Sequence, residues 1–195
     1  MTGAAAGDVE VSIVIPCRDE AGTIATDVRE AAAALTRLGY VGEVVVCDNR
    51  STDGSAAAAR AAGARVVTQS VRGYGAACLA GLEAAAGRWL VLVDGDGTYG
   101  FEELHRFVEP LRAGYDVVLG TRRNGTIEAE AMRRRHRHLL EPLQTALSRR
   151  FLPFPVSDVR CGYRAIARAA FDRLALGATG VEFASEMVLA AAKAG

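Results

Sequence analysis

An apolar run that stops at a pair of aspartates constrains this chain more than any other feature. Residues 88–93 read Arg-Trp-Leu-Val-Leu-Val, and Asp94, Gly95 and Asp96 follow directly. Such a run predicts a buried strand that delivers its carboxylates to the carboxyl edge of a sheet, where open α/β sheets bind ligands. Carboxylate oxygens suit Mg²⁺ or Mn²⁺ that bridges to phosphates. We therefore expect a divalent cation and a nucleoside diphosphate here, with an ordinary polar turn as the alternative.

The pattern of the first 120 residues predicts an α/β fold. Strand-like and helical stretches alternate, which predicts a mainly parallel central sheet flanked by helices on both faces. Polar or proline residues end several strands, and a parallel sheet brings those ends to one edge. The expected strands are residues 10–16, 43–48, 65–68, 88–93 and 115–120, and the expected helices are residues 23–38, 56–62, 73–86, 102–111, 167–174 and 183–194.

Composition is typical of one globular domain. The chain has 195 residues, of which half are apolar and about a quarter are charged, so it is long enough to bury a core. The formal net charge of zero argues against a nucleic-acid partner. Residues 1–8 are small and polar, and we expect them to form a flexible terminus. Residues 128–150 are basic, and we expect a helix that is broken near Pro142.

The cysteines and the absence of long apolar runs predict a cytoplasmic protein. Cys17, Cys47, Cys78 and Cys161 are far apart and lack metal-ligand spacing, which is typical of free thiols in a reducing compartment. The first residues do not resemble a signal peptide, and no stretch approaches the roughly 18 apolar residues that span a bilayer. We expect membrane contact to be peripheral, or to involve sequence outside this chain.

Seven motifs in order resemble the family 2 inverting glycosyltransferases of the GT-A fold, and among them the polyprenyl-phosphate branch that includes dolichol-phosphate mannose synthase. The motifs span residues 10–190. Asp19 and Asn49 replace the asparagine and the second aspartate that are usual in the first two motifs, and Thr98 replaces a frequent glutamine. The stretches that carry the resemblance are residues 15–20 (IPCRDE), 46–55 (VCDNRSTDGS), 72–81 (RGYGAACLAG), 94–96 (DGD), 120–122 (GTR), 157–164 (SDVRCGYR) and 180–186 (GVEFASE).

The resemblance implies a donor site and a division of the chain. Residues 9–195 would form a single GT-A catalytic domain, with a nucleotide-sugar half at 9–121 and an acceptor half at 122–195. The glycines of residues 73–75 would let the backbone pass close to the nucleotide. The alternative role of Pro16 is to end a strand, and the alternative role of Glu20 and Asp53 is to cap a helix. The implied donor-binding residues are Pro16, Arg18, Glu20, Asp48, Asn49, Asp53, Gly73, Asp94, Gly95 and Asp96.

The implied catalytic groups surround the leaving diphosphate. Asp94 and Asp96 would hold Mg²⁺ or Mn²⁺, with Asp96 the more direct ligand, and Arg122 and Arg164 would face phosphate oxygens. Asp158 would orient Arg164 or the acceptor. The alternative is that Asp158 and Arg164 form a solvated ion pair. The catalytic set that the resemblance implies is Asp96, Arg122, Asp158, Arg164 and Glu182.

The expected reaction is an inverting transfer of a hexose from a GDP- or UDP-linked donor. A polyprenyl-phosphate acceptor is already anionic and needs no general base, whereas a hydroxyl acceptor needs one, for which Glu182 or Glu186 is the candidate. Their alternative role is capping and solubilising a helix. The basic cluster of Arg133, Arg134, Arg135 and Arg137 either contacts an acceptor phosphate or an anionic membrane surface, or is a solvated helix face.

Two other functions compete with this interpretation. A nucleotidyltransferase would use a similar sheet and similar acids, but the glycine-rich signature expected after its first strand is absent. A nucleotide-binding module without catalysis would bind the donor and give no metal-dependent turnover.

Overall fold

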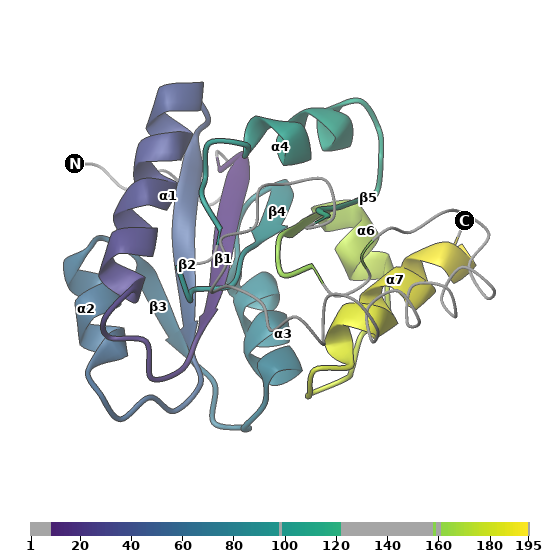
Figure 1. Cartoon of the computed structure of the whole chain (residues 1–195). Coiled ribbons are helices and arrows are strands. Elements are labelled where there is room, and N and C mark those ends of the chain that lie inside the picture. The colour runs from purple at the N-terminus through teal and green to yellow at the C-terminus, as the bar shows by residue number, and fades with distance from the viewer. Residues whose placement is uncertain (1–8, 98, 122–157, 159–160, 195) are drawn as a thin grey trace.

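The computed structural model describes residues 9–97, 99–121, 158 and 161–194. A six-stranded sheet in the order β3-β2-β1-β4-β6-β5 forms its centre. Figure 1 shows helices packed on both faces of this sheet. The elements are β1 Val11–Cys17, α1 Ile24–Leu38, β2 Gly42–Asp48, α2 Ser55–Ala61, β3 Arg65–Thr68, α3 Tyr74–Ala84, β4 Trp89–Leu92, α4 His105–Arg112, β5 Val117–Leu119, β6 Arg164–Ala167, α6 Arg168–Arg173 and α7 Phe183–Ala194.

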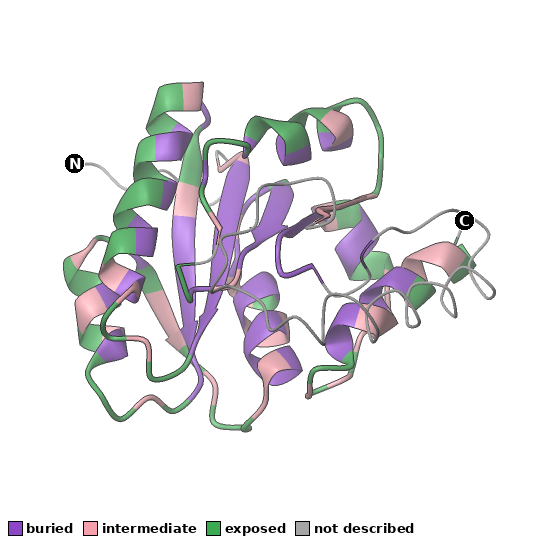
Figure 2. Ribbon diagram, viewed as in Figure 1, coloured by how far each residue is buried: buried purple, intermediate pink, exposed green. Residues whose placement is uncertain are grey.

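The sheet is mainly parallel, as the sequence predicts. β1 pairs in parallel with β2 on one side and with β4 on the other, and β2 pairs in parallel with β3. All seven residues of β1 and all four of β4 are buried, because both faces of these strands are covered by helices. Figure 2 shows this buried centre.

One strand was not predicted. β6 lies between β4 and β5 and runs antiparallel to both. Its four residues, Arg164 to Ala167, are all buried, although the strand begins with an arginine. A four-residue strand that starts with a charge has no local signal, because its position depends on pairing with residues more than 70 positions away.

The helices form two layers. α1, α2 and α4 cover one face, where Tyr40, just after α1, donates a hydrogen bond to Glu109 of α4 at 2.9 Å. α3, α6 and α7 cover the other face, where Arg168 of α6 donates to the carbonyl of Leu82 in α3 at 3.1 Å. The helices therefore flank the sheet on both faces, as expected.

Local signals explain where α1 begins and ends. Its buried residues, which include Ile24, Val28, Ala31 and Leu35, recur at helical spacing and face the sheet. Gly39 ends the helix in the left-handed conformation at φ 71°, and its N–H bonds back to the last turn.

The order of the strands fixes where a ligand site can form. β1 lies between β2, which the chain visits next, and β4, to which it returns later. The carboxyl ends of β1 and β4 are therefore neighbours at a point where the direction of winding reverses, and such points are where open α/β sheets bind ligands. In the part of the chain that the structure describes, no helix is long and apolar enough to cross a membrane.

Candidate active site

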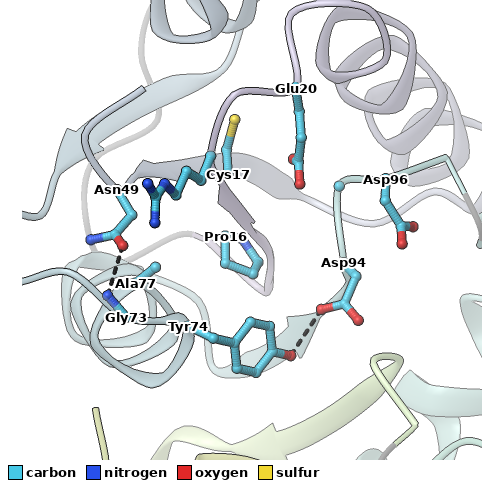
Figure 3. A pocket seen from close by; sticks show the side chains of 11 residues that line it. Pro16, Cys17, Glu20, Asn49, Gly73, Tyr74, Ala77, Asp94 and Asp96 are labelled. Atoms are coloured by element: carbon cyan, nitrogen blue, oxygen red, sulfur yellow. Dashed lines mark hydrogen bonds between the residues drawn. The ribbon is translucent and has the colours of Figure 1, made fainter. Parts of the chain in front are cut away.

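A cavity of about 390 Å³ opens at the carboxyl ends of β1 and β4. The strand ends supply two of its sides and the start of α3 supplies a third, as Figure 3 shows. Eight of the residues that the resemblance implied for the donor meet at this cavity. The lining residues are Pro16, Cys17, Arg18, Glu20, Asn49, Gly73, Tyr74, Ala77, Asp94, Gly95 and Asp96.

Asn49 forms one side of the cavity and is fully hydrogen-bonded to backbone. Its side-chain amide donates to the carbonyls of Gln69 at 3.1 Å and Val71 at 2.7 Å, and its Oδ1 accepts from the N–H of Gly73 at 2.9 Å. The residue is 3% exposed. Asn49 therefore fixes the loop that leads into α3, and both N–H donors of its amide are used by the protein itself. We call Asn49 and the backbone of residues 69–73 the β2 side.

The loops after β1 and β2 brace each other through two aspartates. Asp19 accepts from the N–H of Thr52 at 2.7 Å, and Asp53 accepts from the N–H of Ala21 at 2.9 Å. Asp53 also accepts from the N–H of Ser55 at the start of α2. The structure thus places Asp53 outside the cavity lining, in the capping role that was its alternative. Asp48, at the end of β2, is buried and also lies outside the lining.

The turn at Asp94, Gly95 and Asp96 forms the opposite side of the cavity. Tyr74 donates from its hydroxyl to Asp94 Oδ1 at 2.8 Å, and Thr23 donates from its hydroxyl to the carbonyl of Gly95 at 3.0 Å. Asp94 is half-buried and Asp96 is exposed at the rim. The carboxylates therefore reach the cavity from a turn that α1 and α3 hold in place. We call this turn, together with Glu20 and Asp27 behind it, the β4 side.

The β4 side contains two carboxyl groups that are destabilised as anions. Burial, followed by the charge of Asp96, raises the pKa of Glu20 to about 7. Burial, followed by the charges of Glu30 and Asp96, raises the pKa of Asp27 to about 6. Among the described residues, Glu20 Oε2 and Asp27 Oδ2 are buried without a hydrogen-bond partner. Two carboxyl oxygens of the β4 side are thus buried without a hydrogen bond from the described residues.

The glycines of residues 73–75 have a different neighbour from the one expected. A Cβ on Gly73 would lie 2.1 Å from the carbonyl oxygen of Thr179, and one on Gly75 would lie 2.2 Å from that of Ala178. The close approach that these glycines permit is therefore to the loop before α7. The backbone of Gly73 also lines the cavity, so the loop serves two contacts.

Two of the residues predicted around the phosphates, Arg164 and Asp158, are not among the residues that line the cavity. Arg164 is 1% exposed, and its guanidinium donates to the carbonyls of Cys161 and Ala184. Asp158 is buried as well. Arg122, the basic stretch at residues 128–150 with its four arginines, and residues 1–8 lie outside the described residues.

Glu182 and Glu186 bind backbone instead of facing the cavity. Glu182 accepts from the N–H of Gly180 at 2.9 Å, and Glu186 accepts from those of Gly177 at 3.0 Å and Ala178 at 2.9 Å. Both side chains border a separate groove beside α6 and α7. Both carboxylates thus bind N–H groups of the loop that precedes α7.

Three contributors to the site were missed from the sequence. Tyr74 was hidden between two glycines, and Cys17, whose thiol donates to Glu20, looked like an ordinary strand residue. The sequence does distinguish Asp27, because this aspartate lies among the apolar residues Ile24, Val28 and Ala31, which recur at helical spacing in α1. An acid on the apolar stripe of a helix indicates a buried carboxyl group with a specific role.

Comparison with known proteins gives concordant matches. A model of the glycosyl transferase family 2 matches residues 12–175. The low-salt glycan biosynthesis hexosyltransferase of Haloferax volcanii is 37% identical over 182 residues, which are 93% of this chain and 44% of that protein. An undecaprenyl-phosphate 4-deoxy-4-formamido-L-arabinose transferase of Pseudomonas aeruginosa is 34% identical over 171 residues, covering 84% and 49% of the two chains. The chain spans about half the length of these two relatives.

Solved structures share the fold. The glucosyl-3-phosphoglycerate synthase of Mycobacterium tuberculosis, in complex with phosphoglyceric acid, superposes with a TM-score of 0.73 at 25% identity, covering 94% of this chain and 68% of that one. The same synthase has been crystallised with Mn²⁺ and UDP-glucose, and that structure superposes with a TM-score of 0.72 at 22% identity, covering 98% and 73% of the two chains. The chain thus has the GT-A fold.

Proposed function

The chain belongs to glycosyl transferase family 2, and from that premise we propose that it transfers a hexose, with inversion, from a nucleoside diphosphate donor to a polyprenyl phosphate with the help of a divalent cation. One observation carries the proposal. One side of the cavity is lined by Pro16, Arg18 and Asn49, and the opposite side is lined by Asp94 and Asp96. That arrangement suits a nucleoside on the β2 side and a diphosphate on the β4 side.

The β4 side fits a divalent cation. Asp94 and Asp96 supply hard oxygen ligands. The pKa of Glu20 is raised mainly by burial and secondly by the charge of Asp96, and a cation would offset that charge. Among the described residues, no group of three or more histidines, cysteines or acids is placed to bind a metal. We therefore infer that Asp96, supported by Asp94, holds Mg²⁺ or Mn²⁺ together with diphosphate oxygens. When bound, the cation stabilises the charge that develops on the leaving diphosphate.

The residues of the chain supply position and electrostatics for the transfer. Pro16 and Arg18 border the space for the nucleoside, and Gly73 brings its backbone to the same space. Glu20 lines the same cavity beside the Asp96 turn. The sugar then lies at the open side of the cavity, where an acceptor approaches its anomeric carbon opposite to the diphosphate.

The contacts of Glu182 and Glu186 support an acceptor that is already anionic. Both carboxylates are used by backbone N–H groups, and neither lines the cavity. A phosphate acceptor attacks without a general base, whereas a hydroxyl must lose its proton. The undecaprenyl-phosphate transferase of Pseudomonas aeruginosa is a relative with an acceptor of this kind in its name. Such an acceptor resides in a bilayer, and we propose that Arg133, Arg134, Arg135 and Arg137 supply a peripheral contact with anionic lipid.

Donor titration tests the proposal most directly. We expect calorimetry with UDP-glucose, GDP-mannose and related donors to show binding of one base, and expect that binding to require Mn²⁺. The selected donor is then incubated with undecaprenyl phosphate and, separately, with 3-phosphoglycerate. Transfer to the lipid supports the acceptor assignment, and transfer only to the soluble compound contradicts it. Metal-independent binding without turnover on any acceptor would indicate a binding module.

A further inference from the structure

We propose that Glu186 and Glu182 are positioning residues that act through the loop at residues 177–180 and through Tyr74 to fix the carboxylate of Asp94. This inference rests on the function proposed above, because it concerns the same cation and diphosphate site. It assigns to the two glutamates a role other than proton transfer. It also gives Tyr74 a role that its position between two glycines did not suggest.

The first step is the hold of the two glutamates on the loop. Glu186 accepts from Gly177 through Oε1 and from Ala178 through Oε2, at 3.0 and 2.9 Å. Glu182 accepts from Gly180 through Oε1 at 2.9 Å. Three of the four backbone N–H groups at residues 177–180 are thus bound by carboxylates of α7 and its N-terminal flank. Hydrogen bonds to charged acceptors are stronger than neutral ones. The loop is therefore fixed relative to α7.

The second step is the contact between this loop and the start of α3. The carbonyls of Thr179 and Gly180 accept from the N–H groups of Ala76 at 3.0 Å and Gly75 at 3.1 Å. These N–H groups belong to the first turn of α3, where no carbonyl of the helix can reach them. The absent side chains of Gly73 and Gly75 leave the space that the loop occupies. The loop therefore fixes the N-terminus of α3.

The third step leads from α3 to the cavity. Tyr74 is the first residue of α3, between the two glycines that seat the loop, and its side chain crosses the cavity toward Asp94 (Figure 3). Its hydroxyl donates to Asp94 Oδ1 at 2.8 Å.

Asp94 is constrained from the opposite side as well. A Cβ on Gly162 would lie 1.8 Å from Asp94 Oδ2, so the backbone of Gly162 packs directly against this carboxylate. With Tyr74 on Oδ1 and Gly162 near Oδ2, the plane of the carboxylate is set by its neighbours. A preset carboxylate lowers the cost of ordering the site when a cation and diphosphate bind.

The test compares Tyr74→Phe, Glu186→Gln and the double variant. Free Mn²⁺ is measured by electron paramagnetic resonance, first with Mn²⁺ alone and then with Mn²⁺ and UDP or GDP. We expect Tyr74→Phe to weaken Mn²⁺ binding about tenfold, because it removes one hydrogen bond to a charged group. We expect Glu186→Gln to weaken it about threefold, since a glutamine retains only one acceptor atom. The matched control is Tyr115→Phe, which alters an exposed tyrosine.

The double variant separates this mechanism from simple destabilisation. If Glu186 acts through Tyr74, Glu186→Gln adds little to the effect of Tyr74→Phe on Mn²⁺ affinity, whereas independent effects multiply. Fully multiplied effects, or Mn²⁺ binding by Tyr74→Phe equal to that of the unaltered protein, would overturn the inference alone. An unaltered protein that binds neither Mn²⁺ nor any donor would overturn the proposed function, and this inference with it.

Discussion

The two sides of the cavity differ in how their polar groups are satisfied. On the β2 side, both N–H donors of the Asn49 amide and its Oδ1 are hydrogen-bonded to backbone. On the β4 side, Glu20 and Asp27 each have a buried oxygen without a partner among the described residues, and both have a raised pKa. The Asn49 amide of the β2 side is thus hydrogen-bonded within the protein, whereas the β4 side has buried carboxyl oxygens that are not. We conclude that the β2 side determines the shape of the cavity, and that the β4 side holds the buried carboxyl groups that a cation would stabilise.

Asp96→Asn changes the β4 side at its exposed carboxylate and has the largest expected effect. We expect transfer to fall by at least about 100-fold, because a neutral amide cannot replace the anionic ligand beside the leaving diphosphate. Thermal unfolding should stay near that of the unaltered protein, since Asp96 lies at the rim. Kinetics with saturating Mn²⁺ and thermal unfolding measure both. Asp172→Asn, at an exposed position of α6, is the control, and full activity of Asp96→Asn would contradict the cation assignment.

Asn49→Asp changes the β2 side while keeping the shape of the side chain. It removes two N–H donors and places a carboxylate against the carbonyls of Gln69 and Val71, so we expect a loss of about 1–3 kcal/mol in the free energy of unfolding. Urea unfolding at neutral pH measures the loss. Because a protonated carboxyl regains one donor, the difference should narrow at low pH. Unchanged stability would mean that the hydrogen bonds of this amide do not hold the β2 side together.

The arrangement of the strands was largely predictable from sequence. Apolar runs and helical patterns gave each strand and helix before residue 120 to within a few residues, because each element buries one continuous face or stripe. The meeting of the ends of β1 and β4 followed from parallel pairing. β6 was missed, since its position depends on an antiparallel pairing between Arg164 and Leu92 that no local pattern records.

The partners of the polar side chains were less predictable than the strands. A sequence shows that Gly73 and Gly75 permit a close approach, but it does not show that the approaching group is the loop at residues 177–180. Arg164 has the residue type of a phosphate ligand, yet its guanidinium bonds to backbone carbonyls in a buried position. Asn49 was expected at the donor and lies there, but its amide is used by the protein itself. Hydrogen-bond partners distant in sequence decide these roles.

Glu20→Gln tests the β4 side through the pH dependence of the free energy of unfolding. The pKa of Glu20 is raised from 4.5 to about 7 in the folded chain, so the folded state binds its proton more tightly than the unfolded state. Its contribution to stability is therefore complete below about pH 4 and is lost as pH rises through about 7. We expect the metal-free protein to lose on the order of 1 kcal/mol between about pH 5 and pH 8, and Glu20→Gln to lose less. Urea unfolding at both pH values measures the difference. Mn²⁺ should restore stability at the higher pH, and equal pH dependence of the two proteins would contradict a raised pKa of Glu20.

Asp53→Asn has the smallest expected effect, because Asp53 belongs to the exposed brace behind the β2 side. Its carboxylate accepts from Ala21 and Ser55, and the hydrogen bond from the Ser55 side chain is the main cause of its lowered pKa. A lowered pKa means that the brace stabilises the fold above about pH 4 and weakens as pH falls through the folded-state value. Thermal unfolding should therefore show a small deficit for Asp53→Asn at neutral pH that disappears in acid, with donor affinity reduced no more than stability. A larger loss of donor affinity than of stability would place Asp53 in contact with the donor. The β2 side would then depend on a bound ligand, as the β4 side does, and the difference between the two sides would disappear.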